Sequence, residues 1–126
     1  MIEKTVMIDG KEWRLRSSAL IPKLYRAKFG RDLVRDMQSL SKAYKRVRDA
    51  ELTEDEKEQE YLSVMDLEVF ERVAWMMLKH AGEDVGDDPD EWLMNLDGVF
   101  SVYEALPEIL ALWNANNATT STPRKK

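Results

Sequence analysis

The sequence predicts a mainly α-helical protein, with an N-terminal β-hairpin at about residues 2–16 packed on a bundle of about five helices. Three observations support this fold. Two β-prone runs near the start are joined by the turn signal Asp9-Gly10. Apolar residues then recur at helical spacing in several later segments, and glycine, proline or capping residues lie between those segments. The chain is therefore expected to begin extended and to continue helical.

The hairpin is predicted by its turn and by an alternating second strand. A type I′ turn needs a positive φ at both central positions, which Asp9-Gly10 tolerates. The run 11–16 alternates strictly, so Trp13 and Leu15 fall on one face and charged residues on the other. Because an isolated hairpin is only marginally stable, we expect helices to cover the Trp13 face.

The first helix is expected after two serines. Ser17 and Ser18 can cap it, and Pro22 is acceptable only in a first helical turn. The helix should therefore begin between Ala19 and Pro22 and end at Gly30.

The second helix is expected to begin after Asp32, which can cap it. Basic groups cover most of this helix. One narrow apolar stripe runs along it at helical spacing, formed by Leu33, Met37, Leu40, Tyr44 and Val47.

An acidic connector occupies residues 49–62. Thr53 and Glu56 have the spacing of a capping box, which favours a short helix. The low hydrophobicity and dense like charge of the segment equally favour disorder.

The strongest helical periodicity lies between Phe70 and Ala81, and Gly82 follows as a stop. Trp75 and Met76 widen its apolar stripe, so this helix is expected to be central to the core.

Two further helical segments complete the predicted domain, residues 1–115. The run Asp88–Glu91 combines a cap, a proline at the first position and an acid at the third. The segment Val99–Asn114 has one apolar side but contains Pro107, which predicts a kink or two helices meeting there. Residues 116–126 lack apolar periodicity and are predicted to form a flexible basic tail.

The composition excludes several kinds of chemistry. The chain has no cysteine, hence no disulfide and no thiolate ligand. Its one histidine, His80, is expected near the end of a helix, where a positive charge interacts favourably with the helix dipole. It has no glycine-rich phosphate loop, and the acids at 83–91 do not match a calcium loop. No run of 18 apolar residues and no signal peptide are present, so neither a membrane span nor a membrane partner is expected. We predict a protein that is not an enzyme, without catalytic, cofactor-binding or metal-binding residues.

Charge is partitioned along the chain, whose net charge is −5. Nine basic groups lie between residues 23 and 48, whereas residues 83–97 hold seven acids and no base. The basic helix 31–48 could bind nucleic acid, as in a phage regulator, but the acidic overall charge and the lack of a helix-turn-helix pattern argue against it. The plainer interpretation is a solvated helix face, and attraction between opposite blocks of two subunits leaves self-association open.

The later helices carry more apolar side chains than a narrow two-layer core requires. Ordinary core packing explains most of them, yet such a surplus can also line a groove for a partner helix. The hypothesis that follows is a partner-binding surface bordered by Trp75, Met76, Tyr103, Leu110 and Trp113.

The order of these features resembles the tail assembly chaperones of siphophages that infect Gram-positive hosts. The resemblance covers nearly the whole chain and contains no catalytic signature. It is carried by the hairpin at 8–15, the helix at 66–81, Glu91-Trp92-Leu93, the run from Phe100 to Trp113, and the tail from Asn116 to Lys126.

The resemblance implies a protein that binds and solubilises the tape measure protein during tail morphogenesis. Such chaperones act in the cytoplasm of the infected bacterial cell and are absent from the mature virion. Many have a longer form, made by a programmed frameshift, that recruits the tail tube protein; the codons of Lys125-Lys126 could form a slippery site. A structural tail or head-completion protein is the remaining alternative.

Overall fold

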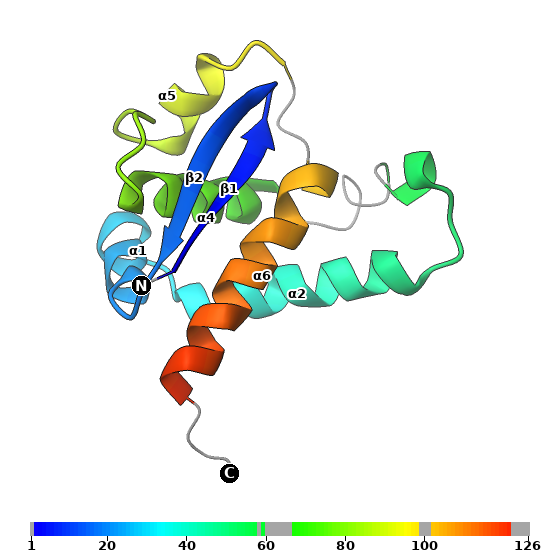
Figure 1. Cartoon of the computed structure of the whole chain (residues 1–126), viewed down its shortest axis with the longest axis horizontal. Helices are drawn as coiled ribbons and strands as arrows, with labels where there is room; N and C mark the ends of the chain where they lie inside the picture. Colours follow the sequence, from blue (N-terminus) through cyan, green and yellow to red (C-terminus); the bar gives the residue numbers. More distant parts are fainter. Residues whose placement is uncertain (1, 58, 60–66, 99–101, 122–126) are drawn as a thin grey trace.

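A computed structural model describes residues 2–57, 59, 67–98 and 102–121, except for the side chains of 102–103 and 116–121 (Figure 1). The chain is mainly helical with an N-terminal antiparallel hairpin, which confirms the predicted fold class. Residues 54–57 are also helical. The longer elements are β1 (Ile2–Ile8), β2 (Lys11–Ser17), α1 (Ile21–Phe29), α2 (Leu33–Asp49), α4 (Leu67–His80), α5 (Pro89–Met94) and α6 (Val102–Ser121).

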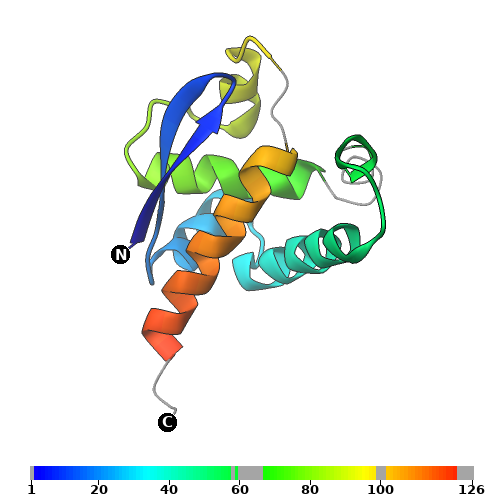
Figure 2. The ribbon, with the colours of Figure 1, turned by 45° about the vertical axis from the view of Figure 1, so that its right-hand side comes forward.

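The hairpin forms through the predicted turn. Asp9 and Gly10 have φ values of 56° and 77°, so both central positions are left-handed, as a type I′ turn requires. The strands pair from Ile8 with Lys11 to Ile2 with Ser17. Their covered face packs β2 against α4 and β1 against α6, and Figure 2 shows α6 running between the hairpin and α2. Leu15 is fully buried on that face.

Helix α1 begins and ends where the sequence predicts, but its cap differs. Its N-cap residue is Leu20, which makes no side-chain cap bond, so the serine caps are wrong in position. Ser18 Oγ instead accepts the N–H of Leu20 at 3.2 Å, just before the helix. At the other end Gly30 is left-handed, with φ of 69°.

Helix α2 has the predicted cap and stripe. Asp32 Oδ1 accepts the N–H of Val34 at 3.0 Å. Four stripe residues are buried, Leu33, Met37, Leu40 and Val47, and Tyr44 is half-buried. In the connector that follows, Thr53 N–H donates to Glu56 Oε1 at 2.9 Å and Glu56 N–H to Thr53 Oγ1 at 3.2 Å. The capping box is therefore formed, whereas residues 58 and 60–62 of the connector lie outside the described residues.

Helix α4 is central to the core, as predicted. It packs against β2, α1, α2, α5 and α6. Every residue from Val73 to Leu78 is buried, and Gly82, at φ 85°, follows the helix. A helix contacted by so many neighbours needs apolar side chains around most of its circumference.

Helix α5 begins at the predicted cap, where Asp88 Oδ1 accepts the N–H of Glu91 at 2.9 Å. Of the two outcomes predicted at Pro107, two separate helices are wrong, because Val102–Ser121 is one helix with Pro107 inside it. Pro107 lies close to the start of α6, where it removes one backbone hydrogen bond from the first turns, and burial of Leu106 and Ile109 beside it favours continuation. The helix also includes residues 116–121, which the sequence assigns to a tail, and residues 122–126 lie outside the described part.

Candidate functional site

The residues predicted to border a partner surface lie mostly in the core. Trp75, Met76, Leu110 and Trp113 are only 3%, 5%, 6% and 8% exposed, and the side chain of Tyr103 lies outside the described residues. In this conformation the prediction of an open apolar surface at these four residues is therefore wrong. Whether they bind a partner stays a prediction.

The residues that cover Trp75 show why the later helices carry more apolar side chains than a two-layer core requires: these side chains are packed against other parts of the fold. The ring of Phe29 meets that of Trp75 edge-on at 5.9 Å, and Trp75 Nε1 donates to the carbonyl of Val85 at 3.0 Å. The ammonium groups of Lys28 and Lys79 lie 5.3 and 5.9 Å from the ring centroid. Helix α1 and the loop after α4 thus cover a face that periodicity alone leaves open.

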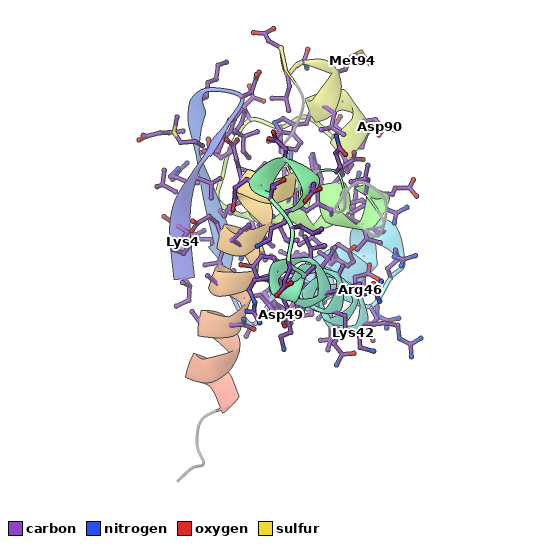
Figure 3. The ribbon with its side chains drawn as sticks, turned by 90° about the vertical axis from the view of Figure 1, so that its right-hand side faces the viewer. Lys4, Lys42, Arg46, Asp49, Asp90 and Met94 are labelled. Atoms are coloured by element: carbon purple, nitrogen blue, oxygen red, sulfur yellow. The ribbon has the colours of Figure 1, made fainter. Side chains whose placement is uncertain are left out.

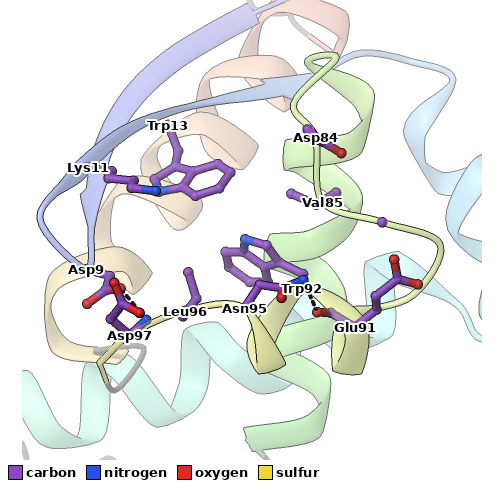
Figure 4. Close-up of a pocket in the computed structure, with 11 residues that line it drawn as sticks. Asp9, Lys11, Trp13, Asp84, Val85, Glu91, Trp92, Asn95, Leu96 and Asp97 are labelled. Carbon is purple, nitrogen blue, oxygen red and sulfur yellow. Dashed lines mark hydrogen bonds between the residues drawn. The ribbon is translucent and has the colours of Figure 1, made fainter.

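A recessed surface lies elsewhere, between the hairpin turn, the loop after α4 and helix α5 (Figure 4). We call it the tryptophan cleft. Its volume is about 430 Å³. The lining residues are Asp9, Lys11, Trp13, Asp84, Val85, Gly86, Glu91, Trp92, Asn95, Leu96 and Asp97.

Two tryptophans form the apolar wall of the tryptophan cleft. Trp92 is 2% exposed on α5, and Trp13 is half-buried on β2. Their rings meet edge-on, with centroids 5.8 Å apart and planes at 80°. Trp13 Nε1 also donates to the carbonyl of Ile8 at 3.3 Å, which fixes that ring against its own hairpin. The wall is therefore held by contacts to two separate elements.

Carboxylates form the polar part of the cleft. Asp9, Asp84, Glu91 and Asp97 lie there with one base, Lys11. Asp9 Oδ2 accepts the N–H of Asp97 at 2.7 Å, which joins the hairpin turn to the segment after α5. An aromatic wall beside an excess of carboxylates is complementary to a cationic side chain, whose alkyl part can contact the rings.

Close backbone approaches shape the cleft at two glycines. A Cβ at Gly86, which has φ of 74°, would lie 2.6 Å from Glu91 Oε2. A Cβ at Gly98 would lie 2.6 Å from Asp9 Oδ1. Each glycine thus lets a cleft carboxylate lie against the main chain.

A buried polar cluster joins α1 to α2. Tyr25 Oη donates to Asp36 Oδ2 at 2.6 Å, and Arg31 donates to both oxygens of Asp36 at 2.8 Å. The hydrogen bonds from Arg31 lower the pKa of Asp36, and burial raises the pKa of Tyr25. Asp36 is therefore a carboxylate at neutral pH, and its role here is to hold two helices together.

His80 lies at the end of α4, as the sequence predicts, but its surroundings disfavour the protonated form. Its Nε2 lies 2.8 Å from Ser18 Oγ, and Arg16 donates to the His80 carbonyl at 3.3 Å. Burial lowers the pKa of His80, and the charge of Arg16 lowers it further. A protonated histidine complementing the helix dipole is therefore not the favoured state.

Helices α1 and α2 and their junction carry exposed cations, which we together call the basic face. Figure 3 shows Lys42 and Arg46 on the outer side of α2. Of the two acids in this stretch, Asp36 points into the core. All nine basic residues are exposed: Lys23, Arg26, Lys28, Arg31, Arg35, Lys42, Lys45, Arg46 and Arg48.

Sequence reasoning did not find the tryptophan cleft. Trp13 and Trp92 are separated by most of the chain, and each has a sufficient local role as the apolar residue of its own element. The cluster of acids at 83–97 is the one signal that pointed to this region.

Comparisons with family models, with curated proteins and with solved structures gave no match to this chain. None of the described helices is long and apolar enough to cross a membrane. The described residues contain no group of three or more potential metal-ligating side chains.

Proposed function

We propose that this chain is a siphophage tail assembly chaperone that binds the tape measure protein and keeps it soluble while the tail is built. The observation that carries the proposal is the order of features along the sequence, from the hairpin at 8–15 to the run ending at Trp113. The hairpin and the helices whose order carries this resemblance are present in the fold.

The tryptophan cleft is the surface that we assign to the client. A tape measure helix exposes an apolar stripe before the tube encloses it, and basic side chains commonly flank such a stripe. One lysine or arginine of the client would enter the cleft, with its alkyl part against the half-buried ring of Trp13, which Trp92 supports from behind. Its charged end would meet the carboxylates of Asp84 and Glu91. A single small cleft suits moderate affinity, which a chaperone needs in order to release its client.

The proposal is tested by co-expressing the chain with its candidate tape measure protein. The readouts are the soluble fraction of that protein and its co-purification with the chain. We expect Asp84→Lys to reduce co-purification about tenfold, because it places a cation where a client cation binds. Asp55→Lys makes the same charge change on an exposed residue of the connector and should have no effect. If the wild-type chain neither binds nor solubilises the tape measure protein, the proposal is wrong.

The proposal includes finer expectations about the infected cell. The chain would act in the bacterial cytoplasm and be absent from purified virions. A longer product, made by a frameshift near Lys126, would recruit the tail tube protein. Mass spectrometry of infected cells tests for the longer product. Mass spectrometry of purified particles tests for the absence of the chain from virions.

A second candidate function, nucleic-acid binding, is favoured by one observation, the basic face. Exposed cations on the outer side of α2, among them Lys42 and Arg46, could contact phosphates. A gel shift at physiological salt that is abolished by Lys42→Glu with Arg46→Glu, and retained by Asp84→Lys, would support this function. No shift with either single- or double-stranded probes would exclude it.

A further inference from the structure

The outer edge of strand β1 has unused backbone hydrogen-bonding groups. In a hairpin with a two-residue turn, the residues that flank the turn form a hydrogen-bonded pair, and such pairs then alternate along the strands. Ile8 pairs with Lys11, so Glu3, Thr5 and Met7 direct their N–H and C=O groups away from β2. We call these groups the β1 edge.

The equivalent edge of β2 supports this assignment. Arg14 lies opposite Thr5 in the pairing register, so its N–H should also point outward. That N–H donates to Glu83 Oε2 at 2.7 Å. The β2 edge is thus partly covered by the loop after α4, a common way to protect a strand edge.

The β1 edge has no comparable cover. None of the residues that the structure describes makes a hydrogen bond with the outward backbone groups of Glu3, Thr5 or Met7. All three side chains are exposed, and Met7 is 52% exposed although it is apolar. A groove of about 360 Å³ runs beside the edge, lined by Thr5, Val6, Met7, Glu104 and Glu108. In Figure 1, β1 lies between β2 and the first turns of α6, which carry the two glutamates of this groove. An extended strand therefore has both hydrogen-bonding groups and space beside β1.

The sequence of β1 is complementary to itself in the antiparallel direction. If two copies pair about a two-fold axis at Thr5, Thr5 faces Thr5, Glu3 faces Met7 and Lys4 faces Val6 of the other copy. No like charges face each other in this register. The outward groups of Glu3, Thr5 and Met7 would exchange about six backbone hydrogen bonds with the second copy.

Charge in the groove also favours a second copy. Lys4 Nζ lies 3.1 Å from Glu108 Oε1, and both Glu104 and Glu108 line this groove. In the paired register, Lys4 of the second copy lies opposite Val6 on the same face of the sheet, beside that groove. The Lys4 ammonium of each copy would thus lie between the acidic grooves of both copies and be attracted to each.

We propose that two copies of this chain associate by antiparallel pairing of their β1 strands about Thr5, which converts two hairpins into one four-stranded sheet. A two-stranded sheet is marginal by itself, and extension to four strands is a common way to stabilise one. The inference concerns the edge of the hairpin and does not rest on the proposed function.

Site-directed crosslinking tests both the association and its register, because the chain has no cysteine of its own. Thr5→Cys places two thiols at the axis, within reach of a disulfide, and should give a covalent dimer under mild oxidation. Met7→Cys is the matched control on the same edge: its two thiols would be about 14 Å apart along the strands, too far to bridge. Non-reducing gels at equal concentration compare the two rates.

Sedimentation equilibrium of the wild-type chain gives the second readout. We expect a dimer that Thr5→Lys and Thr5→Glu each weaken about fivefold, because like charges then face each other. An equal mixture of the two variants should restore the dimer. Thr5 is exposed, so both variants should fold.

The opposing outcomes are distinct. A wild-type chain that sediments as a monomer at about 100 μM, or a dimer that Met7→Cys links as fast as Thr5→Cys, overturns the proposal. If the wild-type chain is a monomer and Thr5→Lys instead abolishes binding of the tape measure protein, the edge belongs to that client and self-pairing is overturned.

Discussion

Asp36 is a charged residue on the apolar side of α2, three residues after Leu33 and four before Leu40. It is 4% exposed and accepts hydrogen bonds from Tyr25 and Arg31. A helical pattern treats an aspartate as a surface residue, because aspartate is rarely buried unless it is paired. The pairing partners come from α1 and from the residue after Gly30, so only the fold reveals them.

Replacing Asp36 tests this buried cluster. Asp36→Asn removes the charge that Arg31 and Tyr25 bind, and we expect it to lower the free energy of unfolding by about 2 kcal/mol. Asp49→Asn is the matched control: Asp49 also pairs with an arginine, Arg48, but it is exposed, so its loss should change stability by less than about 0.5 kcal/mol. Urea denaturation at pH 7 measures both. Equal stabilities of the two variants would contradict a structural role for Asp36.

His80 gives a prediction about pH. Burial lowers its pKa below the ordinary value of 6.5, so the folded state binds the proton less readily than the unfolded state. The free energy of unfolding is therefore highest at a pH above the pKa that His80 has in the unfolded chain. It decreases as the pH falls below that pKa, because the unfolded chain then binds the proton more readily. Because His80 is the only histidine, melting temperature measured between about pH 5 and 7 should fall on acidification. The fall in melting temperature should be smaller in His80→Asn. If that variant shows the same fall, groups other than His80 cause it.

At the scale of elements, the first and last residues of a helix were predictable where an interaction within one turn determines them. Asp32, Asp88, Gly30 and Gly82 are at the ends that the sequence indicates, because a cap or a left-handed residue acts within one turn. The two-helix alternative at Pro107 was wrong for the same reason. The local cost of the proline was correctly recognised, but the burial of the surrounding part of α6 depends on the hairpin and on α2, which no local pattern contains.

The cap of α5 tests how far a local interaction supports the tryptophan cleft. Asp88→Ala removes the bond to the N–H of Glu91 and should cost about 1 kcal/mol. Since α5 has six residues and carries Trp92, hydrogen exchange should increase across Pro89–Met94. Asp87→Ala changes the neighbouring exposed aspartate, whose side chain does not cap the helix, and should leave both measurements unchanged. Comparable effects of the two substitutions would show that the cap is not what holds α5.

At the scale of the whole molecule, the sequence predicted which side chains are apolar but not what covers them. Periodicity identifies the stripe of α4, and it cannot distinguish a stripe that faces the core from one that faces a client. Helix α1 and the loop that carries Val85 close over Trp75. The tryptophan cleft was missed for the converse reason, because its walls come from Trp13 and Trp92, which only the tertiary fold brings together.

Trp75 allows the core and the client-surface interpretations to be separated by stability alone. It is 3% exposed and bonded to the Val85 carbonyl, so Trp75→Ala should lower the free energy of unfolding by about 3–5 kcal/mol through lost contacts and a cavity. A residue kept exposed for a client would cost far less when truncated. Met94→Ala is the control, since Met94 is 81% exposed and should change stability by less than about 0.5 kcal/mol. Chemical denaturation of the free chain measures both. A Trp75→Ala variant as stable as Met94→Ala would mean that the Trp75 side chain is not held in the core in solution, and would restore it as a candidate contact for the client.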